Sequence, residues 1–188
     1  MKIQPNRYQQ ARKLYVPAKP RVIFVTEAPP AFDRNRYFYF ENVRKGDSLF
    51  LELMKVLFPD EIATFAHVKS IRAAKDYFLG RFREEGYFLT HACNEPLPGK
   101  TDATRARIYQ EHLPSLIKEI LQIARPNVPL VLISAVVYKA IGPSLRASGF
   151  NILHDEVIPF PNSGQQINFR RKLRPLLLQH NLLPDHIP

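Results

Sequence analysis

The sequence predicts a single three-layer α/β domain, with helices on both faces of a central parallel sheet of about four strands. The chain has 188 residues, the size of one domain, and 45% of them are hydrophobic, which is enough for a sizeable core. Short apolar runs alternate along the chain with segments of helical periodicity, as in parallel sheets whose strands are joined by helices. No internal repeats occur.

Four short segments are predicted as strands. The first reads Val-Ile-Phe-Val, a continuous apolar run that is typical of a strand buried on both faces. Ala28, Pro29 and Pro30 end it at once, because proline cannot continue the hydrogen-bonded ladder and restricts the residue before it. In order, the predicted strands are residues 22–25, 87–90, 130–133 and 150–160.

Helices are predicted between and after these strands. The turn Gly46-Asp47-Ser48 offers an N-cap to an apolar helical pattern that ends at Pro59. The further helices are a basic one over residues 70–83, a long amphipathic one over 103–124, one that begins at Val136, and a basic closing segment over 170–178. Residues 1–20 form a basic N-terminal arm or short helix, and residues 21–188 form the α/β domain.

Charge is the strongest signal in the composition. The formal net charge is +10, and the sequence pI is about 9.9. A domain this basic usually meets a polyanion, so we expect nucleic acid as a partner. The alternative is a protein whose basic composition is adapted to the chemistry of its own cell. Cys93 is the single cysteine, which excludes an internal disulfide and any multi-cysteine metal site.

The sequence favours a cytoplasmic protein. It contains no apolar run close to the roughly 20 residues that span a bilayer. The first seven residues, Met-Lys-Ile-Gln-Pro-Asn-Arg, lack the apolar stretch of a secretory signal. A monomer without metal or other cofactor is expected.

Polar residues follow the predicted strands at the points where the strands end. In a parallel sheet the carboxyl ends of the strands meet at one edge, and ligands bind beyond that edge. This rule predicts a site there, to which strand ends far apart in the sequence contribute Glu27, Thr90, His91, Asn94 and Asn162.

Residues 22–30, Val-Ile-Phe-Val-Thr-Glu-Ala-Pro-Pro, resemble the first signature of the uracil-DNA glycosylase superfamily, especially its branch with a Gly-Glu-Ala-Pro-Gly core. Phe40 follows Glu27 by thirteen residues, the spacing at which that branch places the aromatic residue that stacks on the base. Residues 88–92 resemble the family's second strand, which ends in a base-reading polar residue. Residues 159–164 resemble its last signature, and the similarity in order and spacing covers roughly residues 20–175.

The resemblance implies an enzyme similar to a DNA glycosylase, which hydrolyses the N-glycosidic bond of a uracil-like or damaged base flipped out of DNA. A carboxylate would position the water or stabilise positive charge on the sugar. The implied catalytic residues are Glu27, Asp33 and Asn162. The implied base-binding residues are Ala28, Pro29, Phe40, His91 and Asn94, with Tyr39 and Phe32 as substitutes for Phe40. Ser163, Gly164, Arg170, Arg171 and Lys172 are implied to contact DNA.

Each of these roles has a structural alternative. Glu27 would instead cap a helix or pair with an arginine, Phe40 would belong to an aromatic cluster, and His91 would bond a neighbouring backbone group. The basic closing segment would be a solvated helical face.

The sequence also departs from the family pattern. Thr26 and Pro30 stand where glycines are expected, and Phe160 stands where the last signature begins with a polar electrophile. These departures favour a second hypothesis, a nucleic-acid-binding relative without catalysis. A third hypothesis is a small-molecule nucleotide-binding α/β protein, although the sequence has no glycine-rich phosphate loop. The iron–sulfur cysteines of the related branch are absent, so no cluster is expected.

Overall fold

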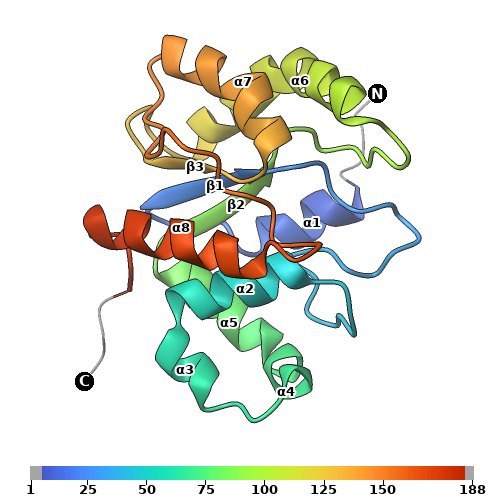
Figure 1. Ribbon diagram of the computed structural model, residues 1–188, viewed down its shortest axis with the longest axis vertical. Coiled ribbons are helices and arrows are strands. Elements are labelled where there is room, and N and C mark those ends of the chain that lie inside the picture. The colour runs from blue at the N-terminus through green and yellow to red at the C-terminus, as the bar shows by residue number, and fades with distance from the viewer. Residues whose placement is uncertain (1–5, 185–188) are drawn as a thin grey trace.

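Three parallel strands form the centre of the structure, a computed structural model that describes residues 6–184. The sheet order is β2-β1-β3, with strands β1 (Val22–Thr26), β2 (Tyr87–His91) and β3 (Leu130–Leu132). Every residue of the three strands is buried, because helices cover both faces of the sheet (Figure 1). The α/β class and the first three predicted strands are confirmed.

Helices α6 (Asp102–Ile123) and α7 (Ala135–Ala147) cover one face of the sheet, and α2 (Ser48–Leu57), α5 (Lys75–Glu84) and α8 (Gln166–Gln179) cover the other (Figure 1). The remaining helices are α1 (Arg7–Lys13), α3 (Pro59–Ala63) and α4 (Val68–Ala73). None of the helices within residues 6–184 is both long and apolar enough to cross a membrane.

The predicted fourth strand is not regular. Residues 150–158 run beside β3, but they form only two isolated parallel bridges, Leu130 to Ile152 and Ile133 to Ile158. Between the two bridges, Nε2 of His154 accepts the hydrogen bond of the Leu132 backbone N–H at 2.9 Å. A side chain therefore takes the place of a backbone carbonyl, and this interrupts the ladder.

The predicted helix over residues 70–83 is two helices. Ala74 separates α4 from α5 with φ −100° and ψ 22°, outside the helical region. The next residue, Lys75, is 0% exposed, and its ammonium lies 3.9 Å from the Asp47 carboxylate and donates to the Tyr37 carbonyl oxygen at 3.3 Å. Burial lowers the pKa of Lys75 to about 7, an effect that Asp47 opposes and Arg72 strengthens.

Helix α1 is docked onto the domain. Asn6 begins it with a capping box to Gln9, and Tyr8 is buried in the core. Arg12 is buried as well and donates to Thr90 of β2 at 2.8 Å. The predicted arm over residues 1–20 is therefore, from residue 6 onward, a helix and a connection packed on the α/β core. Its first five residues, and residues 185–188 of the predicted domain, lie outside the described part of the chain.

Candidate binding pocket at the carboxyl edge of the sheet

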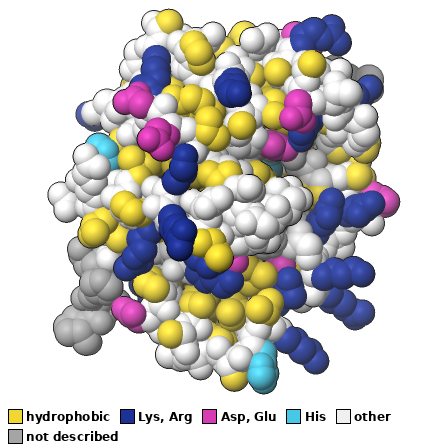
Figure 2. Space-filling view, in the orientation of Figure 1, with side chains coloured by type: hydrophobic (Ala, Val, Ile, Leu, Met, Phe, Trp, Pro, Cys, Tyr) yellow, Lys and Arg dark blue, Asp and Glu magenta, His cyan; other side chains and the backbone are white. Residues whose placement is uncertain are grey.

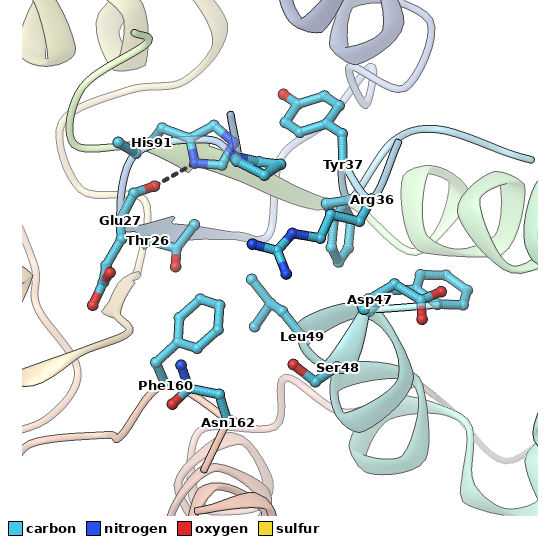
Figure 3. A pocket seen from close by; sticks show the side chains of 15 residues that line it. Thr26, Glu27, Arg36, Tyr37, Asp47, Ser48, Leu49, His91, Phe160 and Asn162 are labelled. Carbon is cyan, nitrogen blue, oxygen red and sulfur yellow. Dashed lines mark hydrogen bonds between the residues drawn. The ribbon is translucent and has the colours of Figure 1, made fainter. Parts of the chain in front are cut away.

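A pocket of about 260 Å³ lies where the strands end (Figure 3). Its walls come from three places: the ends of β1 and β2, the segment from residue 36 to the start of α2, and the loop before α8. Thr26 and His91 are register partners on neighbouring strands, so the two strand ends present their last residues side by side. The predicted edge of the sheet therefore does carry a cavity.

His91 lines this pocket and carries a buried hydrogen-bond acceptor. Its Nδ1 lies 2.5 Å from the backbone oxygen of Glu27, and since a carbonyl oxygen only accepts, Nδ1 carries the proton. Burial, with the charge of Arg12 as the second cause, lowers the pKa of His91 to about 3, so the ring is neutral at physiological pH. Nε2 is then an acceptor, and it is buried without a hydrogen-bond partner among the described residues.

Thr26 supplies a second buried polar atom without a partner. Its Oγ1 makes no hydrogen bond within the described part of the chain, and the residue is 1% exposed. Buried polar atoms in folded proteins are almost always paired, so two adjacent unpaired ones beside a cavity call for a ligand that pairs them. A hydroxyl can donate or accept, whereas His91 Nε2 can only accept.

Glu27 is held rigidly beside the pocket. Its Oε1 accepts from Ser134 Oγ at 2.5 Å, and its Oε2 pairs with Arg105 of α6. The carboxylate is turned away from His91, toward which the Glu27 backbone oxygen points (Figure 3). Glu27 therefore pairs with an arginine, as the structural alternative predicted, and also lines the pocket.

Ser134, which follows the third strand, holds a strained conformation. Its φ of 99° lies in a region that residues other than glycine rarely adopt. The Ser134 hydroxyl accepts from the backbone N–H of Val136 at 3.2 Å as the cap of α7, and it donates to Glu27. Strain of this kind concentrates at functional sites. The strand-end rule, applied to the third strand, would have identified this residue.

Aromatic rings and one cation complete the pocket. Tyr37, Phe38, Phe50 and Phe160 line it, and the Arg36 guanidinium points toward its middle (Figure 3). The side chain of Arg36 is exposed and makes no hydrogen bond or ion pair with the described residues. Planar apolar walls with a few polar groups are the usual lining of a small-ligand site.

The first turn of α2 forms another wall. Asp47 occupies the predicted N-cap position, but its side chain makes no capping bond and instead pairs with Arg72 at 2.7 Å. Within residues 6–184 no side-chain hydrogen bond caps this turn, and residues 47–50 line the pocket. The positive end of the helix dipole therefore faces the cavity, beside the Asp47 carboxylate, which lines the same wall.

The structure brings some of the sequence-predicted residues to the pocket. Glu27, Ala28, His91 and Asn162 line it, together with Pro30 and Phe160. Pro29 lines a neighbouring hollow instead, where Arg105 and Tyr109 lie; the Tyr109 hydroxyl accepts from the Ala28 N–H at 3.2 Å.

Three predicted residues lie elsewhere. Phe40 packs on Tyr8 and Tyr37, under the guanidinium of Arg7, and does not line the pocket. Asn94 belongs to a partly buried network in which it accepts from Arg12 at 2.9 Å and donates to Glu119 at 3.1 Å. Asp33 is exposed and lines a separate hollow.

The residues predicted to contact DNA near the C-terminus differ among themselves. Ser163 and Gly164 are exposed at the turn into α8, with φ values of 45° and 85°. Arg170 pairs with the buried Glu52, and Lys172 pairs with Glu156 at 3.2 Å. Arg171 is exposed and makes no hydrogen bond or ion pair with residues 6–184. Among Arg170, Arg171 and Lys172, Arg171 is therefore the cation without an ion-pair partner in this part of the chain.

Within residues 6–184, no three His, Cys, Asp or Glu side chains are grouped so that they could hold a metal ion. A scan of the chain against protein-family models gives no match, and a search among curated proteins gives none.

Proposed function

We propose that this protein is a DNA glycosylase-like enzyme with a uracil-DNA glycosylase-like fold, which binds a base flipped out of DNA and hydrolyses its N-glycosidic bond. The observation that carries the proposal is the pair of buried, unpartnered atoms, His91 Nε2 and Thr26 Oγ1, in a small pocket lined by aromatic rings. At about 260 Å³, the pocket is smaller than those that hold drug-sized ligands, and a single base is a suitable occupant.

The polar atoms suit a base whose edge carries an N–H next to a carbonyl. Neutral His91 accepts that N–H at Nε2, and a hydroxyl or guanidinium donor from Thr26 or Arg36 bonds the carbonyl oxygen. Uracil, hypoxanthine and xanthine have this edge. Cytosine and adenine lack the ring N–H of that edge in their common forms. Their ring nitrogen is an acceptor, so it would face a second acceptor, Nε2 of His91, and no hydrogen bond would form.

The hydrolysis needs two charges to be stabilised. As the bond between the sugar and the base breaks, the base leaves with the electron pair, and the sugar becomes electron-poor until a water oxygen bonds to it. The water then loses one proton, and the departing base gains one, so the products are the sugar hydroxyl and the neutral base. Glu27 is placed to orient that water or to stabilise the positive sugar, held by Ser134 and Arg105. The negative charge on the departing base is stabilised by the Arg36 guanidinium, the Asn162 amide and the uncapped start of α2.

The test is incubation with oligonucleotides that contain uracil, hypoxanthine or xanthine, followed by alkaline cleavage at any abasic site. Glu27→Gln is expected to slow excision on the order of 100-fold, and His91→Ala by roughly tenfold or more. Glu84→Gln and His67→Ala are matched controls, because both residues are exposed and neither lines the pocket. Absence of abasic product from every substrate contradicts the enzymatic proposal.

A nucleic-acid-binding protein without catalysis is the second candidate. The observation that favours it is that both carboxylate oxygens of Glu27 are already engaged, one by Ser134 and one by Arg105. Phe160 also offers no hydrogen bond to a departing base. This candidate predicts that the protein binds a base-containing strand through the same pocket, with His91→Ala weakening the binding, but yields no abasic site.

A further inference from the structure

We propose that a hollow formed by residues 33–46 binds the phosphates that flank the base in the pocket, so that the substrate is a nucleic-acid strand rather than a free base or nucleoside. We call it the cationic hollow; it has a volume of about 800 Å³. The inference rests on the proposed function, because it takes the neighbouring pocket to be the base site. Its lining is Asp33, Arg34, Asn35, Arg36, Asn42, Arg44, Lys45 and Gly46.

The cations of this hollow have no ion-pair partner within residues 6–184. Four of its side chains are cations, Arg34, Arg36, Arg44 and Lys45, and one, Asp33, is a carboxylate. All four cations are exposed, and none of them forms a side-chain hydrogen bond or an ion pair with residues 6–184. The C-terminal cations differ, since Arg170 and Lys172 are already paired.

The loop that carries these cations is fixed at three points. Tyr39 is buried, and its hydroxyl donates to the Leu89 carbonyl oxygen at 3.0 Å and accepts from the Leu89 N–H at 2.8 Å. Asn35 Nδ2 donates to the Asn42 carbonyl oxygen at 2.7 Å and so ties the two sides of the hollow together. The cations therefore project from an ordered loop, so less conformational entropy is lost when a ligand binds.

Gly46 is the third fixed point. Its φ of 78° is a conformation that side chains disfavour, and an added Cβ would lie 3.0 Å from Cδ of Arg36. Glycine here lets the Arg36 side chain lie against the backbone. That contact directs Arg36 along the boundary between the hollow and the pocket.

The cationic hollow adjoins the base pocket. Arg36 and Gly46 line both cavities, so the hollow lies within reach of the phosphates of a strand whose base occupies the pocket. Lys and Arg side chains gather along the right-hand edge of the molecule in Figure 2, the side on which Figure 1 places the loop between β1 and α2. Guanidinium groups bind phosphate oxygens in pairs, so Arg34 and Arg44 together with Lys45 suit more than one phosphate, while Arg36 serves the pocket.

The test is binding of a fluorescent single-stranded DNA oligonucleotide without any damaged base, measured over a range of salt concentrations. Arg34→Ala/Arg44→Ala is compared with Lys19→Ala/Arg125→Ala, which removes the same two charges from exposed residues before β1 and β3, at the opposite edge of the sheet. The hollow variant is expected to bind roughly tenfold more weakly, with a slope of log K against log salt lower by roughly 1.4. The control variant is expected to keep the wild-type slope.

Two competitors separate the possible sources of phosphate. Inorganic phosphate and a nucleoside monophosphate, supplied at the same total phosphate as the oligonucleotide, are expected not to displace it. Displacement by the monophosphate would instead assign the hollow to free nucleotides and overturn the strand proposal. Because all substituted residues are exposed, thermal unfolding of both variants is expected to match the wild type, and circular dichroism checks this.

The outcomes distinguish this inference from the proposed function. Equal loss of binding in both double variants would show that only overall charge matters, and would overturn the hollow as a site. Excision that continues unchanged in the hollow variant at limiting substrate would also overturn it, while leaving the enzyme in place. Binding that depends on the hollow, without abasic product from any base, would sustain the hollow and contradict the excision reaction.

Discussion

Acidification is expected to destabilise the fold through His91. The side chain is 5% exposed, and burial lowers its pKa to about 3, against 6.5 for the free side chain. Between these two values the unfolded chain binds a proton that the native state does not bind. Stability contributed by neutral His91 is therefore complete above pH 6.5 and is lost as the pH falls toward 3.

The magnitude follows from the two pKa values. At pH 5 the His91 ring of the native protein is still neutral, whereas pH 5 is 1.5 units below the pKa of 6.5 in the unfolded chain. Protonation of the unfolded chain therefore lowers the free energy of unfolding by about 2 kcal/mol at this pH. His91→Asn removes this titration and keeps an N–H donor for the Glu27 backbone oxygen. Wild type is therefore expected to lose about 2 kcal/mol more than the variant between pH 7.5 and pH 5.

Urea unfolding of both proteins at the two pH values measures this difference directly. Other groups that titrate in the same range, such as His154, are present in both proteins, so their contributions cancel. His67→Asn is the matched control, because His67 is exposed, and it is expected to follow the wild type. Equal pH dependence in wild type and His91→Asn would refute a neutral buried His91 and, with it, the acceptor role of Nε2.

Three further changes test other parts of the site. Thr26→Val is expected to raise the free energy of unfolding by up to about 1 kcal/mol in urea titrations, because the hydroxyl has no partner, and to weaken base excision. Ser134→Ala is expected to reduce the excision rate by roughly tenfold with little change in KM, because it frees one oxygen of Glu27. Tyr39→Phe is expected to destabilise the protein by about 1–3 kcal/mol in the same titrations, because it leaves both backbone groups of Leu89 unpaired.

The architecture could be predicted from the sequence where local pattern decides it. Continuous apolar runs that end at a proline or a polar residue predicted β1, β2 and β3, since a strand covered on both faces needs apolar side chains on both faces. The fourth strand could not be predicted correctly, because its interruption depends on where the ring of His154 points.

The site was predictable in its location and less so in its members. The strand-end rule selected Glu27, His91 and Asn162, which line the pocket. It also selected Thr90 and Asn94, which instead bond Arg12 and Glu119 away from the pocket. Spacing along the chain selected Phe40, but the loop turns so that Tyr37 and Phe38 line the cavity instead. Such a loop is shaped by contacts far along the sequence, and spacing carries no information about them.

Electrostatic partners were the least predictable feature. Arg170 pairs with Glu52, a residue 118 positions earlier, and its charge is thereby compensated. In the sequence, Arg170 and Arg171 are adjacent and equivalent, and only the tertiary structure separates the paired cation from the exposed one. The same holds for Arg36, whose free guanidinium is visible only once its loop is folded against Gly46.

Neighbouring residues of β2 show why the unpaired atoms of the pocket indicate a ligand. Thr90 is fully buried, and its hydroxyl accepts from Arg12 at 2.8 Å and donates to Glu119 at 2.5 Å. His91, the next residue, points to the other face and has an unpaired Nε2. The chain thus satisfies one buried polar side chain completely with partners from two helices. The fold pairs Thr90 in this way, yet it leaves His91 Nε2 and Thr26 Oγ1 unpaired beside a cavity. We therefore infer that a ligand in the cavity forms the missing hydrogen bonds with these two atoms.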